Sequence, residues 1–128
     1  MKIAIPIWNG YISSAFDFSH SLLLVEVENG TELERSEVSL SARSIPEKAN
    51  QLRYLGAELL ICGAISRPLA SLVASSGIRI LPYVAGQVDE VLKAYFDDRL
   101  FEPQFMLPGC WPGARKGFRR KRRGRRAR

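Results

Sequence analysis

The chain of 128 residues has the length of one domain, because domains cluster near about 100–150 residues. Hydrophobic residues make up 46% and charged residues 25%, which is typical of a globular protein and excludes disorder of the whole chain. No apolar run approaches the roughly 18–20 residues of a membrane span, and the chain does not begin with the pattern of a secretion signal. The two cysteines are too few for a disulfide framework, so a reducing, cytoplasmic location is expected.

The net charge of +6 is unevenly distributed along the chain. Residues 114–128 hold ten of the nineteen basic side chains and no acidic one, so the rest of the chain carries a net charge of −4. The protein is therefore a mildly acidic domain followed by a polycationic tail. The basic residues of this tail are Arg115, Lys116, Arg119, Arg120, Lys121, Arg122, Arg123, Arg125, Arg126 and Arg128.

The first forty residues have the pattern of three strands. Isoleucines alternate with other residues over residues 3–8, which predicts a strand, and residues 13–19 form a polar and aromatic loop with no clear period. Two further β-rich runs, residues 22–27 and 33–40, are separated by Asn29-Gly30. An Asn-Gly pair favours a type I′ turn because both central residues need positive φ, so these two runs are expected to form a hairpin.

From residue 44 onward, helical spacing alternates with short apolar runs. Ser44 and Glu47 have the spacing of a capping box, which predicts the start of a helix that ends near Gly56. Two more helices are expected, one capped by Ser66 and ending at Gly77, the other opened by Gly86 or Gln87. The intervening runs, residues 58–62 and 78–84, are typical of buried strands.

This order of elements predicts an α/β domain over about residues 1–102. Strands that alternate with helices pair in parallel, while the hairpin adds antiparallel strands at one edge. We therefore expect a mixed five-stranded sheet with three helices, then a Pro/Gly-rich loop over residues 103–113 and a basic, disordered tail over residues 114–128.

Several segments of the domain form a series: residues 1–6, 12–30, 56–63, 77–80 and 86–95. In their order and spacing they resemble the dinitrogenase iron-molybdenum cofactor biosynthesis family, whose members have a ribonuclease H-like fold. The resemblance implies a protein that binds, carries or stores an iron-sulfur or iron-molybdenum cluster precursor without catalytic turnover. Proteins that donate and receive the cluster would be its partners.

The chain departs from the pattern of this family at two places. Many members have His-Phe-Gly in the loop before the second strand, where this chain has Ala15-Phe16-Asp17. Many also have Gly-Gly after the central strand, where this chain has Gly63-Ala64. Both departures are compatible with a branch that kept the fold and changed its ligand.

Cys62 is the foremost candidate for a cluster ligand. It ends a predicted parallel strand just before a helix, at the edge where open α/β sheets bind ligands. A helix N-terminus lowers the pKa of a thiol and favours the thiolate that ligates iron, and Gly63 and Ser66 would then contribute to cofactor binding. The alternative is that Cys62 is a buried small hydrophobic side chain, a common role of free cysteine.

Two further residues are candidate metal ligands. His20 is the only histidine of the chain, and because one imidazole cannot hold a metal alone, the alternative is a histidine at a strand edge. Cys110 lies in the Pro/Gly-rich loop and is either a second thiolate or an incidental thiol. The two cysteines lack Cys-x-x-Cys spacing, so a shared site would need the fold or a second subunit to bring them together.

The chain carries no enzymatic motif, so we expect a protein that is not an enzyme. The first predicted strand has none of the carboxylates with which a ribonuclease H-like nuclease holds two Mg²⁺ ions. A phosphate-binding Gly-x-x-x-x-Gly-Lys and a nucleophile elbow are also missing.

The basic tail offers an alternative function. Ten cations within residues 114–128 could bind nucleic acid through its phosphates, or an acidic partner or anionic lipid heads. The simplest alternative is a disordered solubilising end. We expect removal of this tail after Gly113 to leave the melting temperature of the domain unchanged, because the tail contains almost nothing to bury.

Overall fold

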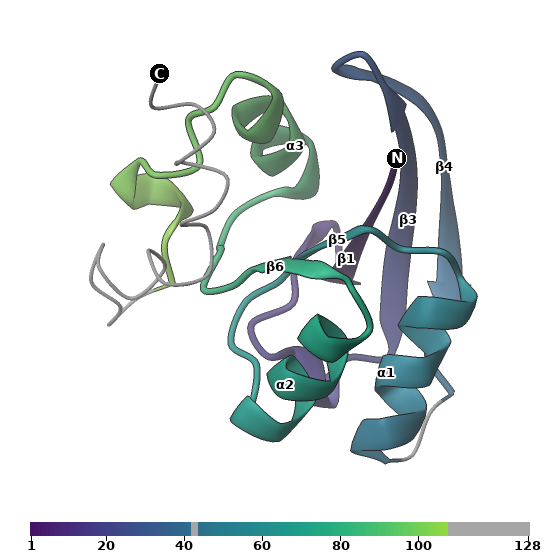
Figure 1. The fold of residues 1–128 in the computed structure, drawn as a ribbon. Coiled ribbons are helices and arrows are strands. Elements are labelled where there is room, and N and C mark those ends of the chain that lie inside the picture. The colour runs from purple at the N-terminus through teal and green to yellow at the C-terminus, as the bar shows by residue number, and fades with distance from the viewer. Residues whose placement is uncertain (42–43, 108–128) are drawn as a thin grey trace.

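The computed structural model describes residues 1–41 and 44–107, which form a mixed sheet with helices on both faces (Figure 1). The predictions for Cys110 and for residues 114–128 lie outside the described residues. The strands are β1 (Lys2–Trp8), β2 (Tyr11–Ile12), β3 (Ser21–Glu28), β4 (Thr31–Ser39), β5 (Leu59–Ile61) and β6 (Arg79–Leu81). The helices are α1 (Ile45–Tyr54), α2 (Arg67–Ser75) and α3 (Val88–Phe96), with 3₁₀ turns η1 (Phe16–Phe18) and η2 (Pro103–Phe105).

The strands follow the order β4-β3-β1-β5-β6 across the sheet, and the short β2 pairs with the end of β1. β3 is antiparallel to both β1 and β4, whereas β1, β5 and β6 run parallel to one another. The predicted mixed α/β sheet with three helices is therefore confirmed, and β2 adds a sixth strand that the sequence pattern did not predict.

Local sequence signals explain the turns and helix ends. Asn29 and Gly30 have φ values of 55° and 75°, as the predicted hairpin turn requires. The Ser44 side chain accepts a hydrogen bond from Glu47 N, and the Glu47 side chain accepts one from Ser44 N, which confirms the capping box. Gly56 follows α1 at a φ of 80°, as expected for a residue that ends a helix.

Strand β6 is shorter than predicted. β6 ends at Leu81, so the prediction of a strand up to residue 84 is wrong. Pro82 has no backbone N–H to continue the ladder, and Tyr83 has a φ of 63°, which is incompatible with extended backbone.

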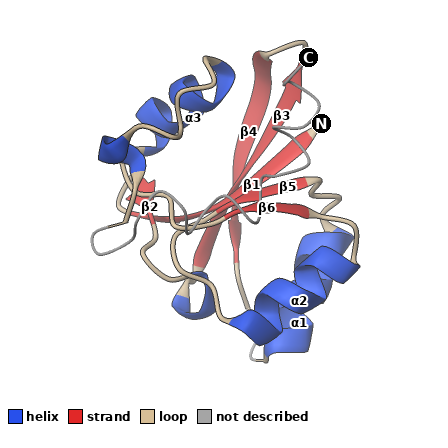
Figure 2. Ribbon diagram, turned by 60° about the vertical axis from the view of Figure 1, so that its left-hand side comes forward, coloured by secondary structure: helices blue, strands red, loops and turns tan. Residues whose placement is uncertain are grey.

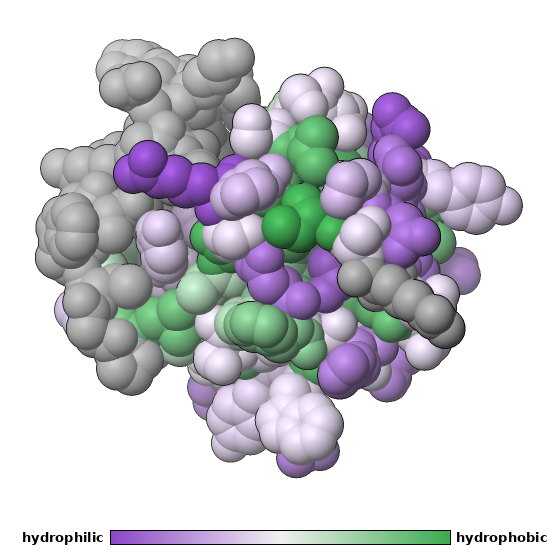
Figure 3. Space-filling model, turned by 90° about the horizontal axis from the view of Figure 1, so that it is seen from below, coloured by the Kyte–Doolittle hydropathy of each residue, from purple (hydrophilic) through white to green (hydrophobic). Residues whose placement is uncertain are grey.

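Two hydrophobic layers enclose the sheet. Helix α3 covers one face, and α1 and α2 cover the other (Figure 2). The side of the molecule below α1 and α2 shows hydrophobic residues as separate groups interrupted by hydrophilic ones (Figure 3). Packing continues past residue 102, because Phe105 is buried in the α3 layer. Within the described residues, no helix is long and apolar enough to cross a membrane.

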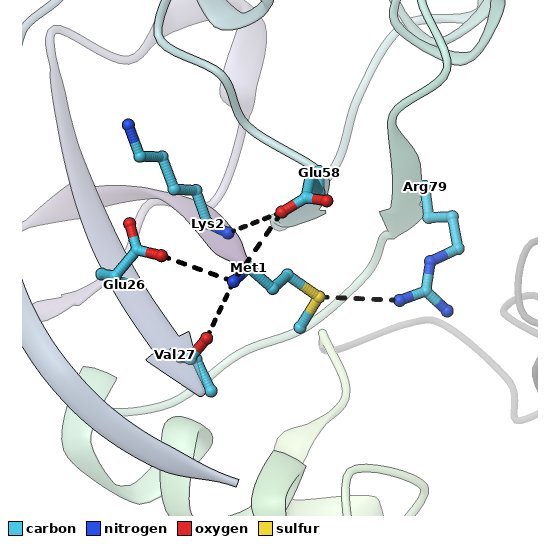
Figure 4. Close-up of polar contacts among 6 residues, drawn as sticks. All are labelled: Met1, Lys2, Glu26, Val27, Glu58 and Arg79. Atoms are coloured by element: carbon cyan, nitrogen blue, oxygen red, sulfur yellow. Dashed lines mark hydrogen bonds and ion pairs between the residues drawn. The ribbon is translucent and has the colours of Figure 1, made fainter. Parts of the chain in front are cut away.

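The amino end of β1 is joined to its neighbours by polar contacts (Figure 4). The Met1 ammonium donates to the carbonyl of Val27 at 2.8 Å and lies 3.4 Å from Glu26 Oε2. The backbone N–H of Lys2 donates to Glu58 Oε1 at 3.0 Å. These contacts lie at the amino ends of the parallel strands, at the opposite end of the sheet from the loops that follow β5 and β6.

Candidate functional site

The carboxyl ends of β1, β5 and β6 lie side by side along one end of the sheet, here called its carboxyl edge, because these three strands are parallel. Ligands of open α/β sheets bind at such an edge. Cys62, Gly63 and Ser66 all follow β5, so the structure brings these three predicted site residues together at this edge.

Residues 13–19, which contain η1, lie across the end of β5 as a loop (the 13–19 loop). Ala15 and Ala64 form an isolated parallel bridge. Phe16 N donates to the carbonyl of Ala64 at 2.8 Å, and Ala64 N donates to the carbonyl of Ser14 at 2.8 Å. The 13–19 loop is therefore joined to the β5–α2 connection by backbone hydrogen bonds in both directions.

Gly63 is required by the close approach of this loop. A Cβ atom at this position would lie 2.6 Å from the carbonyl oxygens of both Ser13 and Ser14. Because backbone oxygens have little freedom to move aside, a side chain here would displace the loop. Gly63 therefore serves packing: the absence of a side chain makes room for the backbone of the 13–19 loop.

Asp17 occupies the N-terminus of α2. Its Oδ1 accepts a hydrogen bond from Ser66 N at 2.8 Å, and its Oδ2 accepts one from Ser66 Oγ at 2.5 Å. Ser66 Oγ also accepts from Leu69 N at 3.4 Å, which confirms Ser66 as the cap of α2. The carboxylate of Asp17 therefore takes the place that a helix N-terminus offers to an anion.

Lys48 of α1 holds the same loop from the other side. Its side chain is buried, with 6% exposed, and its ammonium donates to the carbonyls of Phe16 at 2.9 Å, Asp17 at 3.0 Å and Ser19 at 3.3 Å. The ammonium also lies 5.1 Å from the centre of the Phe16 ring. Burial lowers the pKa of Lys48, and the negative charge of Asp17 opposes this shift.

Cys62 is fully buried in the hydrophobic layer beneath α1 and α2. Burial raises the pKa of its thiol, and the charge of Asp17 raises it further. The expectation that the helix N-terminus lowers this pKa is therefore wrong, because the thiol is shielded from water and a carboxylate already neutralises the helix end. In the described conformation the thiol has no surface exposed to solvent.

His20, the other predicted ligand within the described residues, does not complete a metal site there. His20 is exposed next to the start of β3, where its carbonyl accepts a hydrogen bond from Leu40 N at 2.8 Å. Among the described residues, no group of three or more His, Cys, Asp or Glu side chains is arranged to hold a metal ion. In this conformation the described part of the chain therefore holds no preformed cluster site.

Exposed aromatic side chains lie at the ends of β1 and β2 and in the neighbouring loop. Trp8 and Tyr11 are paired across the turn formed by Asn9 and Gly10, and both are largely exposed. Phe18 of the 13–19 loop is exposed as well. The sequence predicted that a strand ends at Trp8, but it did not predict this second hairpin.

The model of one protein family, described as dinitrogenase iron-molybdenum cofactor, matches residues 1–98. The chain belongs to the dinitrogenase iron-molybdenum cofactor family. This confirms the family that the sequence segments resemble. No curated protein matches the sequence of this family member.

Solved structures share the fold of this dinitrogenase iron-molybdenum cofactor family member. The crystal structure of PH0822 is 23% identical, with a TM-score of 0.73, over 77% of this chain and 93% of that one. A Methanocaldococcus jannaschii protein provisionally named as a dinitrogenase is 17% identical, with a TM-score of 0.66, over 77% and 90%. A Thermotoga protein provisionally named as a NifB protein of the DUF35 family is 21% identical, with a TM-score of 0.59, over 77% and 89%.

Sequence reasoning missed two residues of this family member's site, Asp17 and Lys48. Lys48 gives a recognisable signal in retrospect: together with Ile45, Ala49 and Leu52 it completes the spacing of an apolar helix stripe, in which a lysine is out of place. Asp17 gives no comparable local signal, because its partner Ser66 lies 49 residues further along the chain.

Proposed function

We propose that this chain is a non-catalytic protein that binds or carries an iron-sulfur or iron-molybdenum cluster precursor during metallocluster biosynthesis. Membership of the dinitrogenase iron-molybdenum cofactor family is the observation that supports this proposal most strongly. The cluster is cargo, received from one protein and passed to another, so the chain needs no catalytic residues of its own.

The position of Cys62 supports its role as a ligand of the cargo. Cys62 directly follows β5 at the edge of the sheet where α/β proteins bind ligands. Cysteine thiolate is the ligand that iron-sulfur clusters prefer. Within the described residues, Cys62 carries the only cysteine thiol. The conformation described above would have to change before this thiol meets a cluster.

Anaerobic reconstitution with ferrous iron and sulfide tests the proposal. We expect the wild-type chain to develop the visible charge-transfer absorption of thiolate-bound iron and the Cys62→Ser variant to lose it. Cys110→Ser tests the second candidate thiolate: retained absorption in that variant would leave Cys62 as the cysteine ligand, and lost absorption would add Cys110. Absence of the absorption from the wild type would contradict the carrier function. Equal absorption in the wild type and Cys62→Ser would contradict only the ligand assignment.

A further inference from the structure

The 13–19 loop is fixed to the domain mainly by polar contacts. Asp17 joins it to Ser66 through two hydrogen bonds, and Lys48 joins it to α1 through three. Within the loop, only Phe16 and Ser19 are buried, so the fully buried Phe16 is its single apolar anchor in the core. A segment that is held by a few polar groups can open locally at a much smaller free-energy cost than unfolding of the core.

The end of β5 lies beneath this loop. The loop backbone approaches Gly63 so closely that no Cβ atom would fit between them. Cys62, the preceding residue, is fully buried although it lies at the end of its strand. Phe16 of the loop and Cys62 belong to the same buried hydrophobic cluster, which places the loop and the thiol in one layer.

We propose that the 13–19 loop is a lid over the end of β5, held shut by Asp17 and Lys48, and that its opening with the core intact gives access to the Cys62 thiol. The two contacts hold the lid from opposite sides, one from the start of α2 and one from α1. The use of this opening for loading a cluster rests on the proposed function, but the opening itself does not.

The rate of thiol modification by the coloured disulfide reagent DTNB measures the opening. The full chain is used with Cys110→Ser, which leaves Cys62 as its single thiol. Asp17→Asn removes the charged partner of Ser66, and we expect it to accelerate the modification about tenfold, equivalent to about 1.4 kcal/mol. Asp97→Asn, which changes an exposed aspartate beyond the end of α3, is the matched control and should leave the rate unchanged.

A second variant separates opening of the lid from a direct effect of charge on the thiol. Removal of the positive charge in Lys48→Met would slow the reaction if electrostatics alone controlled the thiolate, whereas release of the lid would accelerate it. We expect acceleration. If Lys48→Met does not fold, Ser66→Ala, which alters no charge but removes a contact with Asp17, should accelerate the reaction instead.

Urea distinguishes opening of the lid from global unfolding. We expect the modification rates to be nearly independent of urea below the unfolding transition, because little surface is exposed when a short loop opens. Modification rates in Asp17→Asn equal to those of its parent, or rates that rise with urea as steeply as global unfolding does, would overturn the proposal. Because the assay contains no iron, failure of the lid is distinguishable from failure of the cluster-carrier function.

Discussion

Lys48 illustrates at the scale of one residue how a buried charge is tolerated. An ammonium removed from water without partners is costly, and lysine is therefore seldom found on the apolar stripe of a helix. Here its three donors meet three backbone carbonyls of the 13–19 loop. The lysine thus gives a charged donor to three carbonyls, of which that of Phe16 also accepts from Ser19 N, and it links α1 to the loop.

Replacing Lys48 by methionine should reveal the size of this contribution. Lys48→Met keeps most of the side-chain volume but removes the ammonium that donates to the three carbonyls, so we expect the free energy of unfolding to fall by about 1–3 kcal/mol in urea denaturation. Lys93→Met, at an exposed position of α3, is the matched control and should change it by less than about 0.5 kcal/mol. Equal stability of the two variants would contradict the structural role of Lys48.

Gly63 allows a second prediction at the scale of one residue. Gly63→Ala places a methyl group 2.6 Å from two carbonyl oxygens, and we expect it to lower the free energy of unfolding by about 3 kcal/mol. Gly30→Ala is the comparison, because its Cβ would meet nothing within 4 Å and only its φ of 75° is unfavourable. That variant should lose about 1 kcal/mol. A smaller loss in Gly63→Ala than in Gly30→Ala would show that the loop moves aside easily.

At the scale of elements, Arg35 connects the edge strand β4 to the helix α3. Its guanidinium makes two hydrogen bonds to the carboxylate of Glu32, at 2.5 and 2.8 Å, and lies 3.0 Å from the carboxylate of Asp89 on α3. The hydrogen bonds from Arg35 lower the pKa of Glu32. This charged group links the edge strand β4 to α3.

The contribution of Glu32 to stability should depend on pH in a defined direction. Because its pKa is lower in the folded state, the contribution is present above pH 4.5 and is lost as the pH falls through the lowered value. The pair is partly exposed, so we expect less than about 1 kcal/mol. An NMR titration should show the Glu32 pKa rising toward 4.5 in Arg35→Gln but not in Arg53→Gln, and an unchanged Glu32 pKa in Arg35→Gln would contradict the pairing.

The elements that the sequence predicted correctly carry local signals. The capping box at Ser44 and the Asn29-Gly30 turn each depend on residues within a few positions, so they can be read from the sequence. β2 could not be predicted in this way, since two residues show no periodicity and the strand exists only through its pairing with β1. The same limit applies to the candidate site, where the contact between Asp17 and Ser66 spans 49 residues.

At the scale of the whole molecule, the lid is associated with only one of the two layers. Lys48 and Ser66 belong to the layer of α1 and α2, whereas α3 packs on the opposite face of the sheet. Opening of the 13–19 loop should therefore leave the α3 layer and the central strands intact.

Hydrogen exchange can test this separation. In Asp17→Asn, we expect the amides of Phe16 and Ala64, which pair the loop with the β5–α2 connection, to exchange faster than in the wild type. The amides between β1 and β3, such as that of Ile5, should exchange at unchanged rates. Acceleration by the same factor at all of these amides would show that the substitution weakens the domain as a whole.

The exposed indole of Trp8 has a practical consequence for optical work. Trp8 is 69% exposed and lies on the hairpin at the carboxyl edge of the sheet, and the chain contains one other tryptophan, Trp111. In a Trp111→Phe background, emission would come from an indole that is already in contact with water in the native state. Its wavelength would therefore change little on denaturation, whereas a coloured or quenching ligand that settles on this edge would dim it directly. Trp8 is thus a native fluorophore for titrations at the edge of the sheet and a poor one for following unfolding of the core.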